Sequence, residues 1–85
     1  MPTILRFRNF RVVIYTDDHH PPHVHTLGPG IEMIYNLNCP AGPPALRANA
    51  KASSPVEKPL SEFIANNLEL LCTAWEKLHG DARGI

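Results

Sequence analysis

The spacing of the apolar residues changes once along this chain, and that change restricts the folds open to it. Up to residue 37, short runs rich in β-branched and aromatic residues alternate with polar residues, which is typical of half-buried strands. Beyond residue 54, apolar residues recur at steps of three and four, the spacing of a helix with one buried stripe. This stripe consists of Leu60, Phe63, Ile64, Leu68, Leu71, Trp75 and Leu78. Because 85 residues can enclose one modest core, we expect a single α+β domain over residues 1–85.

The strand-like part, residues 1–37, predicts two β-hairpins in one small antiparallel sheet. The expected strands are Thr3–Phe7, Phe10–Thr16, His23–Leu27 and Ile31–Leu37. Arg8-Asn9 is short enough for a tight turn in the first hairpin. Gly28-Pro29-Gly30 supplies the turn of the second hairpin, since glycine adopts a positive φ without a steric penalty.

Residues 38–54 are rich in proline and then in small polar residues, and we expect them to form a crossover loop. A C-terminal helix over residues 55–80 should then cover one face of the sheet. Ser54-Pro55-Val56-Glu57 resembles a capping box, but Pro59 disturbs the first turns and favours a regular helix that starts at Pro59. Gly80 is the expected C-cap, and residues 81–85 form a short tail.

Side-chain alternation predicts which residues each face of the sheet presents. In the second hairpin, His25 is expected opposite Glu32 and His23 opposite Ile34. A slip of one residue would bury both histidines, so burial decides the orientation. The face toward the helix is expected to carry Leu5, Phe7, Phe10, Val12, Ile14, Val24, Thr26, Ile31, Met33, Tyr35 and Leu37. The opposite face is expected to carry Arg6, Arg11, Val13, Tyr15, His23, His25, Glu32, Ile34 and Asn36.

Charge and composition exclude some classes of protein. Eight basic and eight acidic side chains cancel, so only a local patch could attract nucleic acid. No stretch approaches the ~20 apolar residues of a membrane span, and the N-terminus has no long apolar segment, so we expect a cytoplasmic protein. Cys39 and Cys72 lack the spacing of a disulfide or zinc framework, and we expect two reduced thiols.

The run Asp17–His25 contains four of the five histidines of the chain. Pro21-Pro22 fixes the local backbone and keeps the preceding residue extended, so the histidines are expected on a rigid loop. Imidazole changes its protonation near neutrality and is the commonest ligand of transition metals. The cluster therefore indicates metal binding, proton transfer or recognition of an anionic partner.

A family resemblance is carried by the following segments: Met1-Pro2-Thr3, Phe10–Tyr15, Asp18-His19, Pro21-Pro22-His23-Val24-His25, Glu32, and Trp75 through His79-Gly80-Asp81. Together they resemble the bacterial domain of unknown function family numbered 4160 (DUF4160), and the string Asp18–His25 is the most specific of them. The resemblance implies a small bacterial protein without an established activity. It also implies a neighbouring gene of the family numbered 2442 (DUF2442), in an arrangement similar to a toxin–antitoxin pair.

One hypothesis for the histidine face is a zinc site. His23 and His25 project from the same side of a strand, and His19 could fold back across the Pro-Pro corner as a third ligand. With Glu32 or water as the fourth ligand, these residues would satisfy the tetrahedral preference of zinc.

A second hypothesis is metal-independent cleavage of RNA, which needs an acid, a base and cations that stabilise the phosphorane. On this hypothesis His23 or His25 is the acid or base and Glu32 its partner. Arg6 and Arg11 bind phosphate, and Tyr15 completes the set.

The leading hypothesis is that the domain is a protein-interaction module, one component of a toxin–antitoxin-like pair. A polar sheet face and a free sheet edge offer a docking surface for another chain. The DUF2442-like neighbour is the expected partner, and a second copy of this chain, giving a homodimer, is the alternative.

Overall fold

The computed structural model describes residues 3–49 and 56–79 and contains a five-stranded antiparallel sheet followed by two helices. Its elements are β1 (Thr3–Phe7), β2 (Phe10–Val13), β3 (His23–Gly28), β4 (Ile31–Asn36), β5 (Ala45–Asn49), α1 (Glu57–Asn66) and α2 (Leu68–His79). The strands pair in chain order, β1-β2-β3-β4-β5. This arrangement confirms the expected α+β class.

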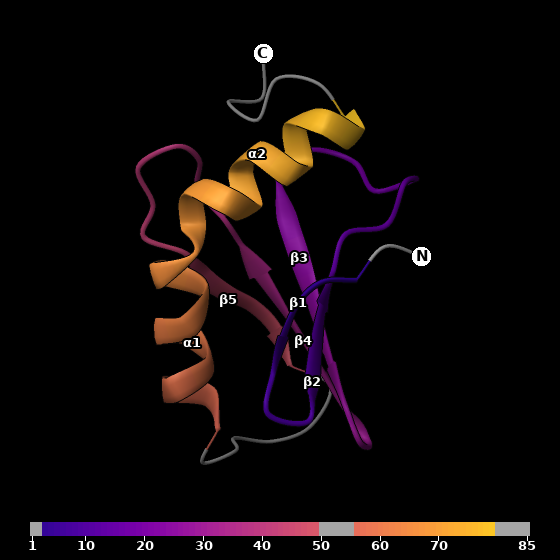
Figure 1. The fold of residues 1–85 in the computed structure, drawn as a ribbon, viewed down its shortest axis with the longest axis vertical. Helices are drawn as coiled ribbons and strands as arrows, with labels where there is room; N and C mark the ends of the chain where they lie inside the picture. The colour runs from indigo at the N-terminus through magenta and orange to yellow at the C-terminus, as the bar shows by residue number, and fades with distance from the viewer. Residues whose placement is uncertain (1–2, 50–55, 80–85) are drawn as a thin grey trace.

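The helices cover one face of the sheet, and α2 lies across the end of the sheet where β3 begins (Figure 1). Between them lies a core to which the strands contribute alternate side chains, most of them fully buried in β3 and β4. The core includes Phe10, Val12, Ile14, Val24, Met33, Tyr35 and Leu37 from the sheet segments, and Leu60, Ile64, Leu71, Cys72 and Trp75 from the helices. Alternation therefore predicted the helix-facing side correctly. No helix in the described part of the chain is long and apolar enough to cross a membrane.

The register of the second hairpin differs by two residues from the expected one. His25 pairs with Ile34, Glu32 with Leu27, and Gly28 with Ile31. Gly28 continues the strand and leaves a two-residue turn. A Cβ at this position would lie 2.7 Å from the Phe10 ring, so the close approach requires glycine here. A shift of two residues preserves the face on which every side chain lies, so only the cross-strand neighbours were predicted wrongly.

The expected loop over residues 38–54 contains a fifth strand, β5, which pairs with β4. Its first three residues, Ala45, Leu46 and Arg47, are all exposed. An edge strand with little burial does not need an alternation of apolar and polar residues, so the sequence pattern gave no strand signal.

The expected single helix over 55–80 is divided at Asn67, whose φ of −114° and ψ of 19° depart from helical values. The Asn67 side-chain amide donates to the Phe63 carbonyl at 2.8 Å, and its own carbonyl accepts from Leu71 at 3.0 Å. Asn67 thus ends α1 and begins α2. Pro59 is tolerated because it lies in the first turn of α1, where backbone N–H groups have no intrahelical partner. The predictions of a capping box at Ser54-Pro55, a C-cap at Gly80 and a tail over residues 81–85 concern residues outside the described part of the chain.

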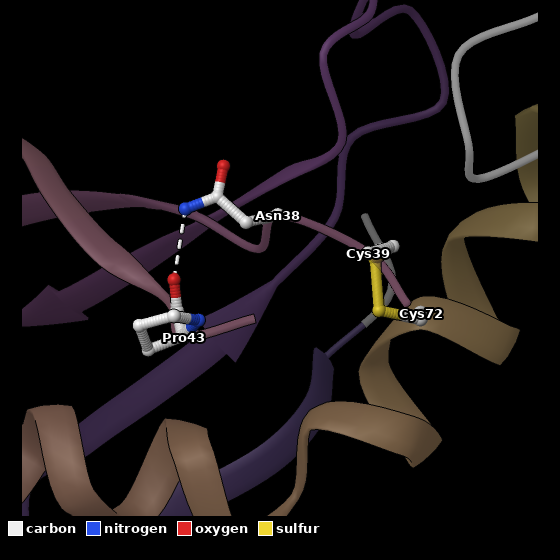
Figure 2. The surroundings of a disulfide bond; sticks show 4 residues. All are labelled: Asn38, Cys39, Pro43 and Cys72. Carbon is white, nitrogen blue, oxygen red and sulfur yellow. Dashed lines mark hydrogen bonds between the residues drawn. A yellow bond between two sulfur atoms is a disulfide. The ribbon is translucent and has the colours of Figure 1, made fainter. Parts of the chain in front are cut away.

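Cys39 and Cys72 form a disulfide that ties the loop after β4 to α2 (Figure 2). The expectation of two reduced thiols is therefore wrong, while the cytoplasmic location stays a prediction. The loop is folded back by two contacts of Asn38: its side-chain amide donates to the Pro43 carbonyl at 2.8 Å, and its carbonyl accepts from Gly42. The sequence could not reveal the pairing, because 33 residues separate two cysteines that tertiary packing alone brings together.

The free energy of unfolding is expected to fall in alkali because of the buried phenol of Tyr35. Burial raises the pKa of its phenol above the usual value, an effect opposed by the Ser61 hydroxyl and reinforced by the Glu57 carboxylate. Because the folded state holds this proton more tightly than the unfolded chain, the contribution is complete below about pH 10 and is lost as the pH rises beyond it. Urea unfolding between pH 8 and 11 should show the fall, and Tyr35→Phe should make it shallower. An unchanged slope, matching that of the control Tyr15→Phe, would contradict this assignment.

Candidate metal centre

The end of the sheet that α2 crosses (Figure 1) carries a cluster of two histidines and one aspartate, with His23 and His25 on the side of β3 opposite Val24. Asp18 Oδ1 lies 3.5 Å from Nε2 of His23 and 3.5 Å from Nε2 of His25. One ligand atom from each of the three residues falls within 4.8 Å of the other two. The three side chains are only 8–14% exposed, so the cluster is largely withdrawn from water.

Both imidazoles are held by their other ring nitrogen. His23 Nδ1 lies 2.8 Å from the Pro21 carbonyl oxygen, and His25 Nδ1 lies 2.9 Å from a carboxylate oxygen of Glu32. Since a carbonyl and a carboxylate can only accept, each Nδ1 carries a proton and donates it. In the neutral ring, the lone pair is then on Nε2, and both lone pairs converge on Asp18. Histidines that bind metals are oriented by the same kind of contact.

Asp18 is held in place by the turn that follows β2. Its second carboxylate oxygen accepts a hydrogen bond from the Tyr15 backbone N–H at 3.1 Å, and its own N–H donates to the Tyr15 carbonyl at 3.2 Å. The first oxygen is left to face the histidines. Pro21 and Pro22 then lead the chain into β3, where His23 and His25 share a face because they are two residues apart.

Three buried side-chain atoms in the described residues have no hydrogen-bond partner: His25 Nε2, Asn36 Oδ1 and Trp75 Nε1. All three belong to the cluster or adjoin it. Asn36 is the cross-strand partner of His23, and the Trp75 ring centre lies 5.4 Å from that of His23. Buried polar atoms are normally satisfied, so this concentration indicates a polar ligand at the cluster.

The C-terminal end of α2 packs against the same region. The Trp75 ring also contacts His20 and His79, with ring centres 5.6 and 4.0 Å apart. His79 Nε2 lies 3.0 Å from the Tyr15 carbonyl and so ties the helix to the segment before Asp18. The sequence alone does not show this contact, because the two residues are 64 positions apart.

The structure brings some of the predicted site residues together and separates others. His23, His25 and Glu32 are in contact, and the Tyr15 ring meets His25 edge-on at 4.7 Å. His19 is exposed and is not a member of the cluster, where Asp18 occupies the position expected for it. Glu32 contacts Nδ1 of His25, whereas Asp18 lies near Nε2, so Glu32 orients the ring. The remaining predicted residues, Arg6 and Arg11, lie opposite each other on neighbouring strands of the same face.

Two imidazole nitrogens and one carboxylate oxygen form a donor set that Zn²⁺ accepts. Tetrahedral bonds of about 2.0–2.1 Å place ligand atoms roughly 3.3–3.4 Å apart, close to the 3.5 Å separations between Asp18 and each histidine. Three protein ligands leave one position for water or another molecule, which is the pattern of reactive rather than purely structural zinc sites. Asp18 was missed as a ligand because its role depends on the Tyr15 turn, although it stands beside the histidines in the sequence.

Comparison with known proteins identifies the family. No curated protein and no solved structure gives a significant match. The family model described as domain of unknown function (DUF4160) matches residues 9–76, a segment that includes the cluster and most of both helices. Because this match covers well over half of the chain, the protein belongs to the DUF4160 family.

Proposed function

We propose that this protein binds a divalent transition metal, Zn²⁺ first among them, through Asp18, His23 and His25. The observation that carries the proposal is the convergence of two Nε2 atoms on one carboxylate oxygen while both Nδ1 atoms are already engaged. A cation between the three groups removes the repulsion between two lone pairs and a carboxylate. It also gives the buried Nε2 of His25 the partner it otherwise lacks.

The alternative to a metal is a pair of protonated histidines that share Asp18. That arrangement places two positive rings with centres 5.2 Å apart in a largely buried site. It also requires hydrogen bonds from both Nε2 atoms, whereas His25 Nε2 makes none. A single bound cation meets both difficulties, so the geometry favours the metal.

Zinc analysis of tag-free protein tests the proposal. The wild type should bind about one Zn²⁺ per chain, and His23→Ala or Asp18→Asn should abolish stoichiometric binding. Glu32→Ala should weaken affinity by about 10- to 100-fold, because it removes the group that orients His25. Zinc at 100 times its Kd should add about 2.7 kcal/mol to the free energy of unfolding of the wild type.

His19→Ala is the matched control, since it removes an exposed histidine next to Asp18 without touching the cluster. Its zinc binding should equal that of the wild type. Loss of zinc in this variant, or retention of zinc in a folded Asp18→Asn protein, would refute the proposed ligand set. Far-UV circular dichroism of each variant separates loss of a ligand from loss of the fold.

The interaction-module and RNA-cleaving hypotheses stay predictions. Co-expression with the DUF2442-like neighbour tests the first, and relief of growth arrest by His25→Ala tests the second. A metal centre is compatible with the first, while the metal-independent mechanism of the second requires activity that survives removal of zinc by a chelator.

A further inference from the structure

Two arginines lie directly opposite each other on the face that carries the Asp18–His23–His25 cluster. Arg6 of β1 pairs with Arg11 of β2, and Arg11 in turn pairs with Leu27 of β3. Phe10 and Val12, which flank Arg11 in β2, belong to the core, so Arg11 itself lies on the opposite face. Arg6 is exposed and Arg11 is partly exposed, so both are open to a ligand from solvent.

Neither of these arginines has an acidic partner within residues 3–49 and 56–79. All ion pairs within the described residues join histidines to Asp18 or Glu32. By contrast, Arg8 in the adjacent turn stacks on the Phe7 ring at 4.9 Å. Arg6 and Arg11 therefore form a cationic pair that no carboxylate of the described residues neutralises, and like charges directly opposite each other on neighbouring strands destabilise a sheet.

The pair is next to the metal centre. His25 is two residues before Leu27, the cross-strand partner of Arg11, so Arg11 and His25 are diagonal neighbours. Such positions lie about 7–8 Å apart, within reach of a long side chain. A guanidinium group at this distance can contact a molecule that also occupies the open position of a metal bound by His25.

We infer that the Arg6–Arg11 pair and the metal centre together bind one phosphate group. The inference rests on the proposed zinc site and adds the class of its ligand. Charge supports this class. The Asp18 and Glu32 carboxylates balance a divalent metal, so the two arginine charges remain, and they match a phosphate dianion. Guanidinium groups also bind phosphate oxygens in a bidentate manner that fits their planar geometry.

Calorimetric titration of the zinc-loaded protein with inorganic phosphate tests the inference. Arg6→Gln or Arg11→Gln should weaken phosphate binding about 10- to 100-fold while the zinc content stays at the wild-type level. Arg47→Gln is the control, because it removes an equal charge from β5 at the opposite edge of the sheet. A parallel titration with dimethyl phosphate, a monoanion, tests the charge match: weaker binding than that of inorganic phosphate assigns the site to free or terminal phosphate, and equal affinity would contradict the match to a dianion.

Thermal unfolding supplies a second readout that a purely structural role would not produce. In phosphate-free buffer, Arg11→Gln should raise Tm, because it removes the repulsion between like charges. Phosphate should raise Tm of the wild type and leave that of Arg11→Gln unchanged. Phosphate binding that survives both arginine substitutions would overturn the inference and leave the zinc site standing. A wild type that binds no zinc would overturn the proposed function itself, and zinc analysis of the same samples distinguishes the two failures.

Discussion

Reduction of the Cys39–Cys72 disulfide is expected to lower the free energy of unfolding by about 3–4 kcal/mol. The bond closes a loop across a sequence separation of 33 residues, and the loss of chain entropy in the unfolded state accounts for a stabilisation of this size. Domains of this length are stable by only about 5–15 kcal/mol, so the reduced protein should be close to its limit at 37 °C. Urea unfolding with and without reductant measures the difference.

The double variant Cys39→Ser/Cys72→Ser is the control for this prediction. It should match the reduced wild type, and reductant should not change its stability any further. A free-thiol assay on unfolded protein first establishes that the bond is present. Equal stability of the oxidised and reduced wild type would contradict the prediction and would mean that packing of α2 alone holds the loop after β4.

The sheet faces could be predicted from the sequence because burial imposes the alternation directly. Val24 and Met33 had to face the helices, and His23 and His25 therefore had to face away from them. The register could not be predicted to the residue, since pairings that differ by two residues satisfy the alternation equally well. An error of two residues in the register leaves every side chain on its predicted face. His25 and Glu32 were therefore still predicted correctly to share a face.

The elements that were missed depend on contacts rather than on periodicity. β5 is an edge strand whose first three residues, Ala45, Leu46 and Arg47, are exposed. The break between α1 and α2 follows from a side-chain hydrogen bond of Asn67, which leaves the three- and four-residue spacing of the apolar stripe intact. In the site, a hydrogen bond from the Tyr15 backbone positions Asp18, and no sequence pattern shows this turn, so His19 and not Asp18 was predicted as the third ligand.

Replacement of Trp75 by alanine is expected to cost about 3–5 kcal/mol, the usual range for removing a buried aromatic side chain. Trp75 is fully buried and belongs to the core, and its ring also contacts the rings of His20, His23 and His79. The substitution therefore removes core packing and the support of His23 together. Leu70→Ala on the same helix is the control: because its side chain is 47% exposed, the change should be within about 0.5 kcal/mol.

Trp75→Phe separates core packing from the contact that Trp75 makes with the zinc site. A phenyl ring keeps most of the packing and removes the buried Nε1 donor, which has no partner within the described residues. If Nε1 is unsatisfied in the working protein, its removal recovers part of the packing loss, since an unpaired buried donor costs about 1–3 kcal/mol. If Nε1 donates to a ligand on the zinc, the metal-free protein behaves as in the first case, and Trp75→Phe in addition weakens binding of that ligand to the zinc-loaded protein. The comparison of unfolding with and without zinc therefore tells whether Trp75 only fills the core or also contacts what the metal binds, and equal destabilisation by phenylalanine and alanine would contradict both.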